Sequence, residues 1–261
     1  MSIARRVART KGPKRAAPCI FCDEPRGSRE HFWPRWMHPL LPTVLDARYD
    51  RETIDKHPLN GETRAGRKGA QGNVQTITIR AVCTGCNNGW MSKLEGAARP
   101  ALTSLVLGQA VTLQAEQVAA VARWIALKCM VAEHASPGKA LTPREDREAL
   151  RASLTIPSYY RIYLAPYHGE SVVAYQRHSL LISLAPKLAS PLSAEVTKNV
   201  QTVSFFMGRV FVHVNAARIE NFDLESRVQI TPFYPAARIF PPFNGGDLRR
   251  PVDREGASLI A

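Results

Sequence analysis

Two C-x-x-C pairs constrain what this chain can fold into more than any other feature of its sequence. Cys19 and Cys22 form the first pair, Cys83 and Cys86 form the second, and 60 residues separate the two pairs. Four thiolates on two tight turns complete a tetrahedral zinc shell. Closing a loop of this length costs on the order of 3–4 kcal/mol, whereas structural zinc returns roughly 10–16 kcal/mol. We therefore expect one closed, structural Zn²⁺ site rather than free thiols or a redox pair.

The remaining cysteine and the apolar residues predict a protein with a substantial core. The fifth cysteine, Cys129, lies in the run 118–135, whose apolar residues recur at helical spacing, so we expect a buried side chain rather than a ligand. Hydrophobic residues make up 45% of the 261 positions, enough for one large domain or two modest ones. No apolar run approaches the roughly 20 residues that span a bilayer, and no apolar signal core is present. We expect a cytoplasmic protein without membrane contact.

Positive charge is concentrated in the part of the chain that carries the cysteine pairs. The formal net charge is +13; residues 1–100 hold 18 Lys and Arg against 9 Asp and Glu, whereas the remaining residues hold 17 against 13. Residues 1–17 contain six basic residues and no acidic one, which predicts a flexible basic arm in preference to an organellar transit peptide. Such a field attracts phosphate backbones without reading sequence. A merely soluble basic protein would show the same charge.

The pattern of elements around the cysteine pairs predicts a compact mixture of loops, strand and helix. The glycine-rich, basic stretch 61–73 is typical of a flexible loop. Alternating β-branched residues at 74–83 predict a strand that delivers Cys83. A helix should start at Trp90 and break near Pro100.

Beyond residue 100 the predicted elements change from helices to strands. We expect helices at 116–134 and 142–153, and strands from about residue 156 onward, with a hairpin at Met207-Gly208. The fold class is therefore α+β. The predicted organisation is a basic arm (1–17), a zinc domain (18–100), a helical segment (101–155) and a β-rich domain (156–261) whose role, including binding of a protein partner, is left open.

Groups suited to metal-ion chemistry lie close to the two cysteine pairs. Glu30 offers a hard oxygen ligand of the kind that Mg²⁺ takes, and the adjacent His31 offers a base that titrates near neutral pH. The amide of Asn87, next to Cys86, offers a second oxygen ligand that the same zinc would bring near. Because a closed four-thiolate zinc site has no open coordination position, these residues are the candidates for chemistry.

The segments "EHFWP" (30–34) and "CTGCNNG" (83–89) resemble the HNH endonucleases, in which an acidic residue followed by histidine lies between two C-x-x-C pairs. The resemblance covers about residues 19–95. It implies a ββα-metal core in which His31 is the general base for water. Glu30 and Asn87 would hold the catalytic Mg²⁺ or Mn²⁺ against the scissile phosphate.

The sequence departs from the HNH pattern at two positions. Glu30 stands where the family more often has aspartate, which lengthens the ligand arm by one methylene. Thr78 stands where the family has its central asparagine, which helps to orient the catalytic histidine. These departures keep a second interpretation open, in which the site is structural.

Two functions therefore follow from the sequence. The first is a metal-dependent HNH-type endonuclease that hydrolyses DNA, with His31, Glu30 and Asn87 as catalytic residues and RNA as another substrate to consider. The alternative is a zinc-stabilised nucleic-acid-binding protein without nuclease activity. In both, Arg64, Arg67 and Lys68 are candidates for contact with the nucleic-acid backbone, with a solvated linker as the competing interpretation.

Overall fold

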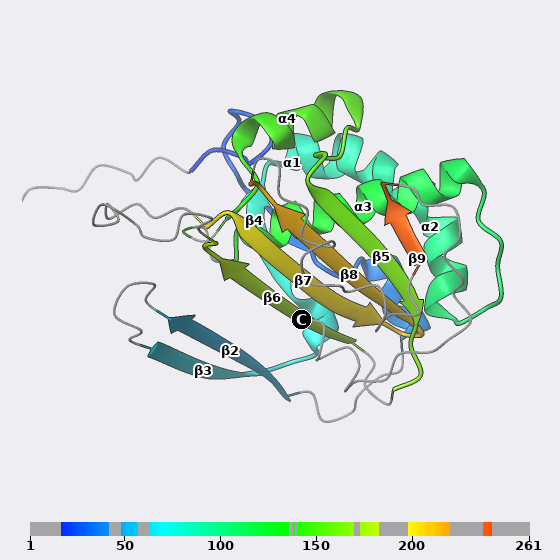
Figure 1. Cartoon of the computed structure of the whole chain (residues 1–261), viewed down its shortest axis with the longest axis horizontal. Helices are drawn as coiled ribbons and strands as arrows, with labels where there is room; N and C mark the ends of the chain where they lie inside the picture. The colour runs from blue at the N-terminus through cyan, green and yellow to red at the C-terminus, as the bar shows by residue number, and fades with distance from the viewer. Residues whose placement is uncertain are drawn as a thin grey trace, which may run out of the picture.

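The computed structural model describes residues 17–41, 48–56, 63–135, 138, 140–169, 173–182, 198–219 and 237–241. These residues form a mixture of helices and antiparallel strands, which confirms the predicted α+β class (Figure 1). All but the last residue of the predicted basic arm, 1–17, lie outside this set. Within the set, no helix combines the length and the apolar character needed to cross a bilayer.

A two-stranded sheet followed by a helix holds the cysteine pairs. Strand β1 (Ser28–His31) pairs antiparallel with β4 (Thr78–Val82). The predicted strand 74–83 is thus confirmed only in its second half, because η2 (Val74–Thr76) is a 3-10 turn. After β1 and Pro34, η1 (Arg35–Leu40) is a single short 3-10 helix that contains Pro39.

The helix after the second cysteine pair is longer than we predicted from the sequence. It begins with α1 (Thr84–Cys86), continues through a π-helical turn, η3 (Asn87–Met91), and ends with α2 (Ser92–Val106). The expected break near Pro100 is wrong. A proline inside a helix costs about 3 kcal/mol, but the buried side chains of Leu102, Leu105 and Val106 each contribute on the order of 1.5–3 kcal/mol when removed from water. Packing therefore outweighs the proline; the buried residues around it are Ala98, Ala101, Leu102, Leu105 and Val106.

Residues 63–71 form a strand, so the predicted flexible loop at 61–73 is also wrong. Strand β2 (Arg48–Lys56) pairs antiparallel with β3 (Thr63–Gln71), in register from Arg48 opposite Gln71 to Lys56 opposite Thr63. The sequence lacks a strand signal because apolar and polar residues do not alternate along either strand.

The later helices and strands follow the predicted pattern closely. Helices α3 (Ala115–Glu133) and α4 (Arg144–Ser153) lie within two residues of the expected ranges. The strands that follow form one antiparallel sheet in the order β6-β7-β8-β5-β9. Their bounds are β5 (Tyr160–Pro166), β6 (Val173–Leu180), β7 (Val200–Met207), β8 (Val210–Ala217) and β9 (Ala237–Phe240).

The predicted hairpin at Met207-Gly208 is confirmed, and its glycine is required by packing. Met207 pairs with Val210 at the turn. Gly208 has a φ of +58°, and a Cβ there would lie 2.4 Å from the carbonyl oxygen of Val106 at the end of α2. Any other residue would therefore be strained by its backbone and would clash with the helix.

One hydrophobic core joins the cysteine-bearing segment to the five-stranded sheet. The Phe32 ring, just after β1, lies with its centroid 4.8 Å from Tyr175 of β6 and 5.3 Å from Phe205 of β7. Helix α3 lies in this core, and Cys129 is fully buried, as predicted. Figure 1 shows the helices gathered on one side of the sheet.

Two charged residues of α3 are buried together with its apolar face. Lys128 and Glu133 are both 0% exposed. The Glu133 carboxyl accepts hydrogen bonds from the backbone N–H of Thr142 at 3.0 Å and from Nε2 of Gln201 at 3.0 Å. Burial raises the pKa of Glu133, and these hydrogen bonds act in the opposite direction. The sheet and the segment before α4 thus satisfy the carboxyl group at the end of the helix.

Candidate functional site

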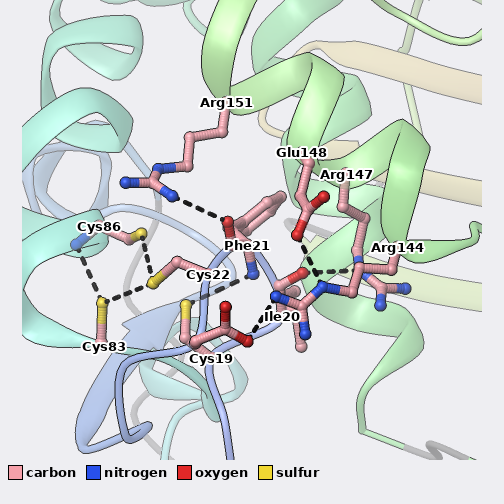
Figure 2. A network of polar contacts seen from close by, with 11 residues as sticks. Cys19, Ile20, Phe21, Cys22, Cys83, Cys86, Arg144, Arg147, Glu148 and Arg151 are labelled. Carbon is pink, nitrogen blue, oxygen red and sulfur yellow. Dashed lines mark hydrogen bonds and ion pairs between the residues drawn. The ribbon is translucent and has the colours of Figure 1, made fainter.

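The structure brings the four predicted zinc ligands together. The ligand atoms of Cys19, Cys22, Cys83 and Cys86 all lie within 4.8 Å of one another. The Cys22 Sγ atom lies 3.6 Å from that of Cys83 and 3.7 Å from that of Cys86 (Figure 2). Zinc bonded to sulfur at about 2.3 Å spaces tetrahedral thiolates about 3.8 Å apart, whereas a disulfide needs about 2.05 Å. These distances fit a shared metal ion and exclude a disulfide in this arrangement.

Local hydrogen bonds orient the thiols toward that common centre. The backbone N–H of Phe21 donates to Cys19 Sγ at 3.5 Å, and the N–H of Cys86 donates to Cys83 Sγ at 3.3 Å. Burial raises the pKa of the Cys86 thiol. At Cys83 burial acts in the same direction, but the Cys86 N–H and the neighbouring thiols outweigh it and lower the pKa. A metal ion would displace the remaining thiol protons, so binding should weaken as the pH falls.

Helix α4 packs its arginines against the first cysteine pair, as Figure 2 shows. Arg147 Nε donates to the carbonyl of Ile20 at 2.8 Å, and Arg151 Nη1 donates to that of Phe21 at 3.3 Å. Arg144 pairs with Asp23 at 2.7 Å. Four thiolates around Zn²⁺ carry a net charge of about −2, which these cations complement. Sequence reasoning missed this contact, although the spacing of the three arginines along α4 places them on one helix face.

Glu30, a predicted ligand for the catalytic ion, contacts a lysine instead. Its side chain is 11% exposed, and its Oε1 accepts a short hydrogen bond from Nζ of the buried Lys128. The same Nζ donates to the His31 carbonyl at 2.8 Å and lies 3.5 Å from Oε2 of Glu95. It also lies 5.6 Å from the centre of the Trp124 ring. Two carboxylates, a carbonyl and an aromatic face thus surround one ammonium group.

Asn87 lies apart from this cluster. Its Nδ2 donates to Ser28 Oγ at 2.7 Å, at the opposite end of β1 from His31. Among the described residues, the four cysteines are the only group of three or more His, Cys, Asp and Glu side chains close enough to share a metal ion. The structure therefore places the Glu30 carboxylate and the Asn87 amide on separate partners.

His31 is half-buried at the end of β1, with properties that suit a base. Thr78, at the family's asparagine position, lies opposite it in the β1–β4 ladder. The ring centroids of His31 and His38 are 6.0 Å apart. Burial lowers the pKa of His31, as does the charge of His38, while Glu30 acts in the opposite direction. Burial therefore favours the neutral form of the His31 imidazole, which can accept a proton. His38 Nε2 donates to the Trp33 carbonyl at 3.0 Å.

The candidate nucleic-acid contacts lie on the β2–β3 ribbon, away from the cysteines. Arg64 and Arg67 are exposed on β3, and Lys68 follows on the same strand, opposite Arg51. Figure 1 shows the ribbon at the margin of the molecule, on the side away from the helices.

Comparisons of this chain with models of known protein families, with curated proteins and with solved structures gave no match.

Proposed function

We propose that this chain is a zinc-stabilised nucleic-acid-binding protein whose HNH-like core does not hold a catalytic divalent ion. The observation that carries the proposal is the buried ammonium group of Lys128 beside Glu30. In the HNH pattern, the residue at the Glu30 position binds the catalytic ion. Here a cation supplied by α3 already neutralises that carboxylate.

The energetics favour lysine over a metal ion at this position. Separating Lys128 from Glu30 would leave a charge unpaired in the core, at a cost of about 3–5 kcal/mol. An ion present at a hundredfold excess over its dissociation constant stabilises the bound state by only about 2.7 kcal/mol. Mg²⁺ also retains several waters, and Glu30 is only 8% exposed. The Lys128–Glu30 ion pair is therefore favoured over a bound metal ion at this position.

Charge supports a nucleic-acid partner for this core. The chain carries a formal net charge of +13, most of it in residues 1–100, and Arg64 and Arg67 are exposed on the ribbon. Lysines and arginines that neutralise phosphates release counterions, which makes binding favourable and dependent on salt. The zinc centre would hold the ββα core, from which the ribbon emerges, in a fixed shape.

The purified, zinc-loaded chain should bind a labelled DNA duplex and leave plasmid DNA uncut. In a titration followed by fluorescence anisotropy, the logarithm of the association constant should fall linearly with the logarithm of salt concentration, with a slope of about −0.9 for each phosphate contacted. Supercoiled plasmid incubated with Mg²⁺ or Mn²⁺ should remain supercoiled. Absence of binding at 50 mM salt would refute the proposal.

A second candidate function is HNH-type hydrolysis of DNA. The lowered pKa of the His31 imidazole favours it, because a general base must be unprotonated to accept a proton. The imidazole lies at the end of β1, where the resemblance implies a general base, and burial lowers its pKa. Its carbonyl, but not its ring, is engaged by Lys128 in the contacts described above. Cleavage would require Lys128 to move from Glu30, so that Glu30 and Asn87 could hold Mg²⁺ or Mn²⁺.

His31→Ala and the matched variant His38→Ala separate the two candidates. If the chain is a nuclease, His31→Ala should slow metal-dependent nicking by about 10²–10⁴-fold, while His38→Ala and the zinc content of both variants change little. Under our proposal, the parent and both variants are equally inactive and bind DNA equally well. Nicking that depends on His31 would replace the binding-protein assignment with the nuclease.

A further inference from the structure

Strand β4 contains a bulge that lies opposite Arg29 of β1. The ladder between the two strands changes register between Ser28 and Glu30, and the pairs on either side of this shift leave one residue on β1, Arg29, and two on β4, Arg80 and Ala81. Two residues opposite one make a β-bulge, which bends the strand and redirects its side chains. Ala81 is 0% exposed, whereas Arg80 is exposed. The bulge therefore places two arginines of neighbouring strands opposite each other.

These two arginines share the outer face of the β1–β4 sheet. Glu30 and Ile79, which pair with each other, are buried on the inner face. Side chains alternate along a strand, so Arg29 and Arg80, the next residues, point to the outer face, and both are exposed. Opposed residues of neighbouring strands lie on the order of 5 Å apart, and like charges so placed destabilise a sheet. An anion between the two guanidinium groups would remove this repulsion.

Within the described part of the chain, neither guanidinium group has a hydrogen bond or an ion pair. The only acidic residue of β1, β4 and η1 is Glu30, which lies on the inner face and is paired with Lys128. Arg35, at the start of η1, adds positive charge near this face, because its charge acts on His31 and lowers the pKa of that imidazole. The outer face is thus suited to an anionic partner.

We propose, resting on the nucleic-acid binding proposed above, that Arg29 and Arg80 together bind one phosphate of the nucleic-acid backbone. A guanidinium group presents its N–H groups as a planar fork that matches two oxygens of a phosphate. Two such forks on neighbouring strands meet the same phosphate from both sides. His31 lies on the same face, but burial favours its neutral form, so the arginines supply the charge.

The double variant Arg29→Gln with Arg80→Gln tests this site, because it removes both guanidinium groups. Affinity for a 20-base-pair DNA duplex, measured by fluorescence anisotropy at 100 mM salt, should fall about 10- to 100-fold. The salt slope should become shallower by about one to two contacts.

The matched control is Arg209→Glu, which lowers the net charge by the same two units. Arg209 is exposed at the turn between β7 and β8, and its N–H donates to the carbonyl of Val106 at 2.9 Å, at the end of α2 that lies away from the cysteines. Helix α2 has 15 residues and is therefore about 22 Å long, more than twice the screening length of about 10 Å at 0.1 M salt. The control should lose less than about threefold in affinity.

A second double variant, Arg29→Lys with Arg80→Lys, separates the fork geometry from charge. It keeps both positive charges but presents compact ammonium groups, so it should bind about 3- to 10-fold more weakly than the parent and keep the parent's salt slope. Contacts to phosphate carry no sequence information. Each variant should therefore lose the same factor on two duplexes of unrelated sequence.

Folding is checked in the same series by thermal unfolding and zinc content. The glutamine double variant removes a like-charge pair, so its unfolding temperature should be unchanged or slightly raised, with about one zinc per chain. If this variant does not fold, the single variants Arg29→Gln and Arg80→Gln decide the question, and each should lose at least about threefold in affinity.

The outcomes separate this inference from the function on which it rests. A parent chain that does not bind DNA would refute the proposed function. A parent that binds DNA while the folded glutamine variants bind equally well would refute only the phosphate site. An equal loss in Arg209→Glu, or a loss confined to one of the two duplexes, would also overturn it.

Discussion

Lys128→Ala should destabilise the folded, zinc-loaded chain by about 3–5 kcal/mol. The lysine is fully buried and its Nζ contacts Glu30, Glu95 and the His31 carbonyl. Removing the ammonium leaves Glu30 buried without a counter-charge, which costs far more than the pair itself contributes to stability. Equilibrium unfolding in urea, followed by circular dichroism, measures the change.

A compensating variant and a metal titration show whether charge or packing causes the loss. Lys128→Met combined with Glu30→Gln keeps the volume and removes both charges, so we expect it to regain most of the lost stability. In Lys128→Ala the two carboxylates have room for an ion, and millimolar Ca²⁺ or Mn²⁺ should raise its stability but not that of the parent. A loss below about 1 kcal/mol in Lys128→Ala would contradict the structural role given to this ion pair.

Removal of zinc should unfold the cysteine-bearing segment. Elemental analysis should find about one zinc per chain, and a chelator should abolish the helical signal of α1 and α2 because structural zinc returns roughly 10–16 kcal/mol. Whole domains are stable by only about 5–15 kcal/mol, so this loss is not tolerated. Release should become easier as the pH falls, since protons compete for the thiolates.

Two cysteine variants provide the matched test of the zinc ligands. Cys86→Ser removes a member of the cluster, so zinc should be lost and the chain should unfold. Cys129→Ser removes a thiol that is equally buried but lies outside the cluster, and its zinc content should stay at one. A folded Cys86→Ser chain with no bound metal would contradict the structural role of the zinc site.

The cysteine cluster was predictable from the sequence because its geometry is local. Each C-x-x-C pair fixes two thiols on a single turn, and the metal supplies the long-range constraint. The strands β5, β7 and β8 were predictable for a similar reason, since each is rich in β-branched and aromatic residues and is buried at nearly every position. Along β2 and β3, apolar and polar residues do not alternate, so this ribbon left no such signal.

The partner of Glu30 was harder to predict, because it lies 98 residues away. One signal was present in the run 118–135. Its apolar residues predict a buried helix, and this helix contains a lysine, Lys128. A buried lysine needs a carboxylate partner. Lys128 could therefore have been matched with Glu30, the acidic residue beside His31. The passage of α2 through Pro100 left no comparable signal, because it depends on packing against residues far along the chain.

Helix α3 carries a buried positive group at Lys128 and a buried acidic group at Glu133, little more than one turn apart. The first is satisfied by β1 and α2 on the cysteine-bearing side, and the second by Thr142 and by Gln201 of the large sheet. Neither side can separate from the helix without leaving one of these groups without its partners in the core. The helix therefore makes folding cooperative between the two parts of the molecule, and the metal that shapes one part also supports the other.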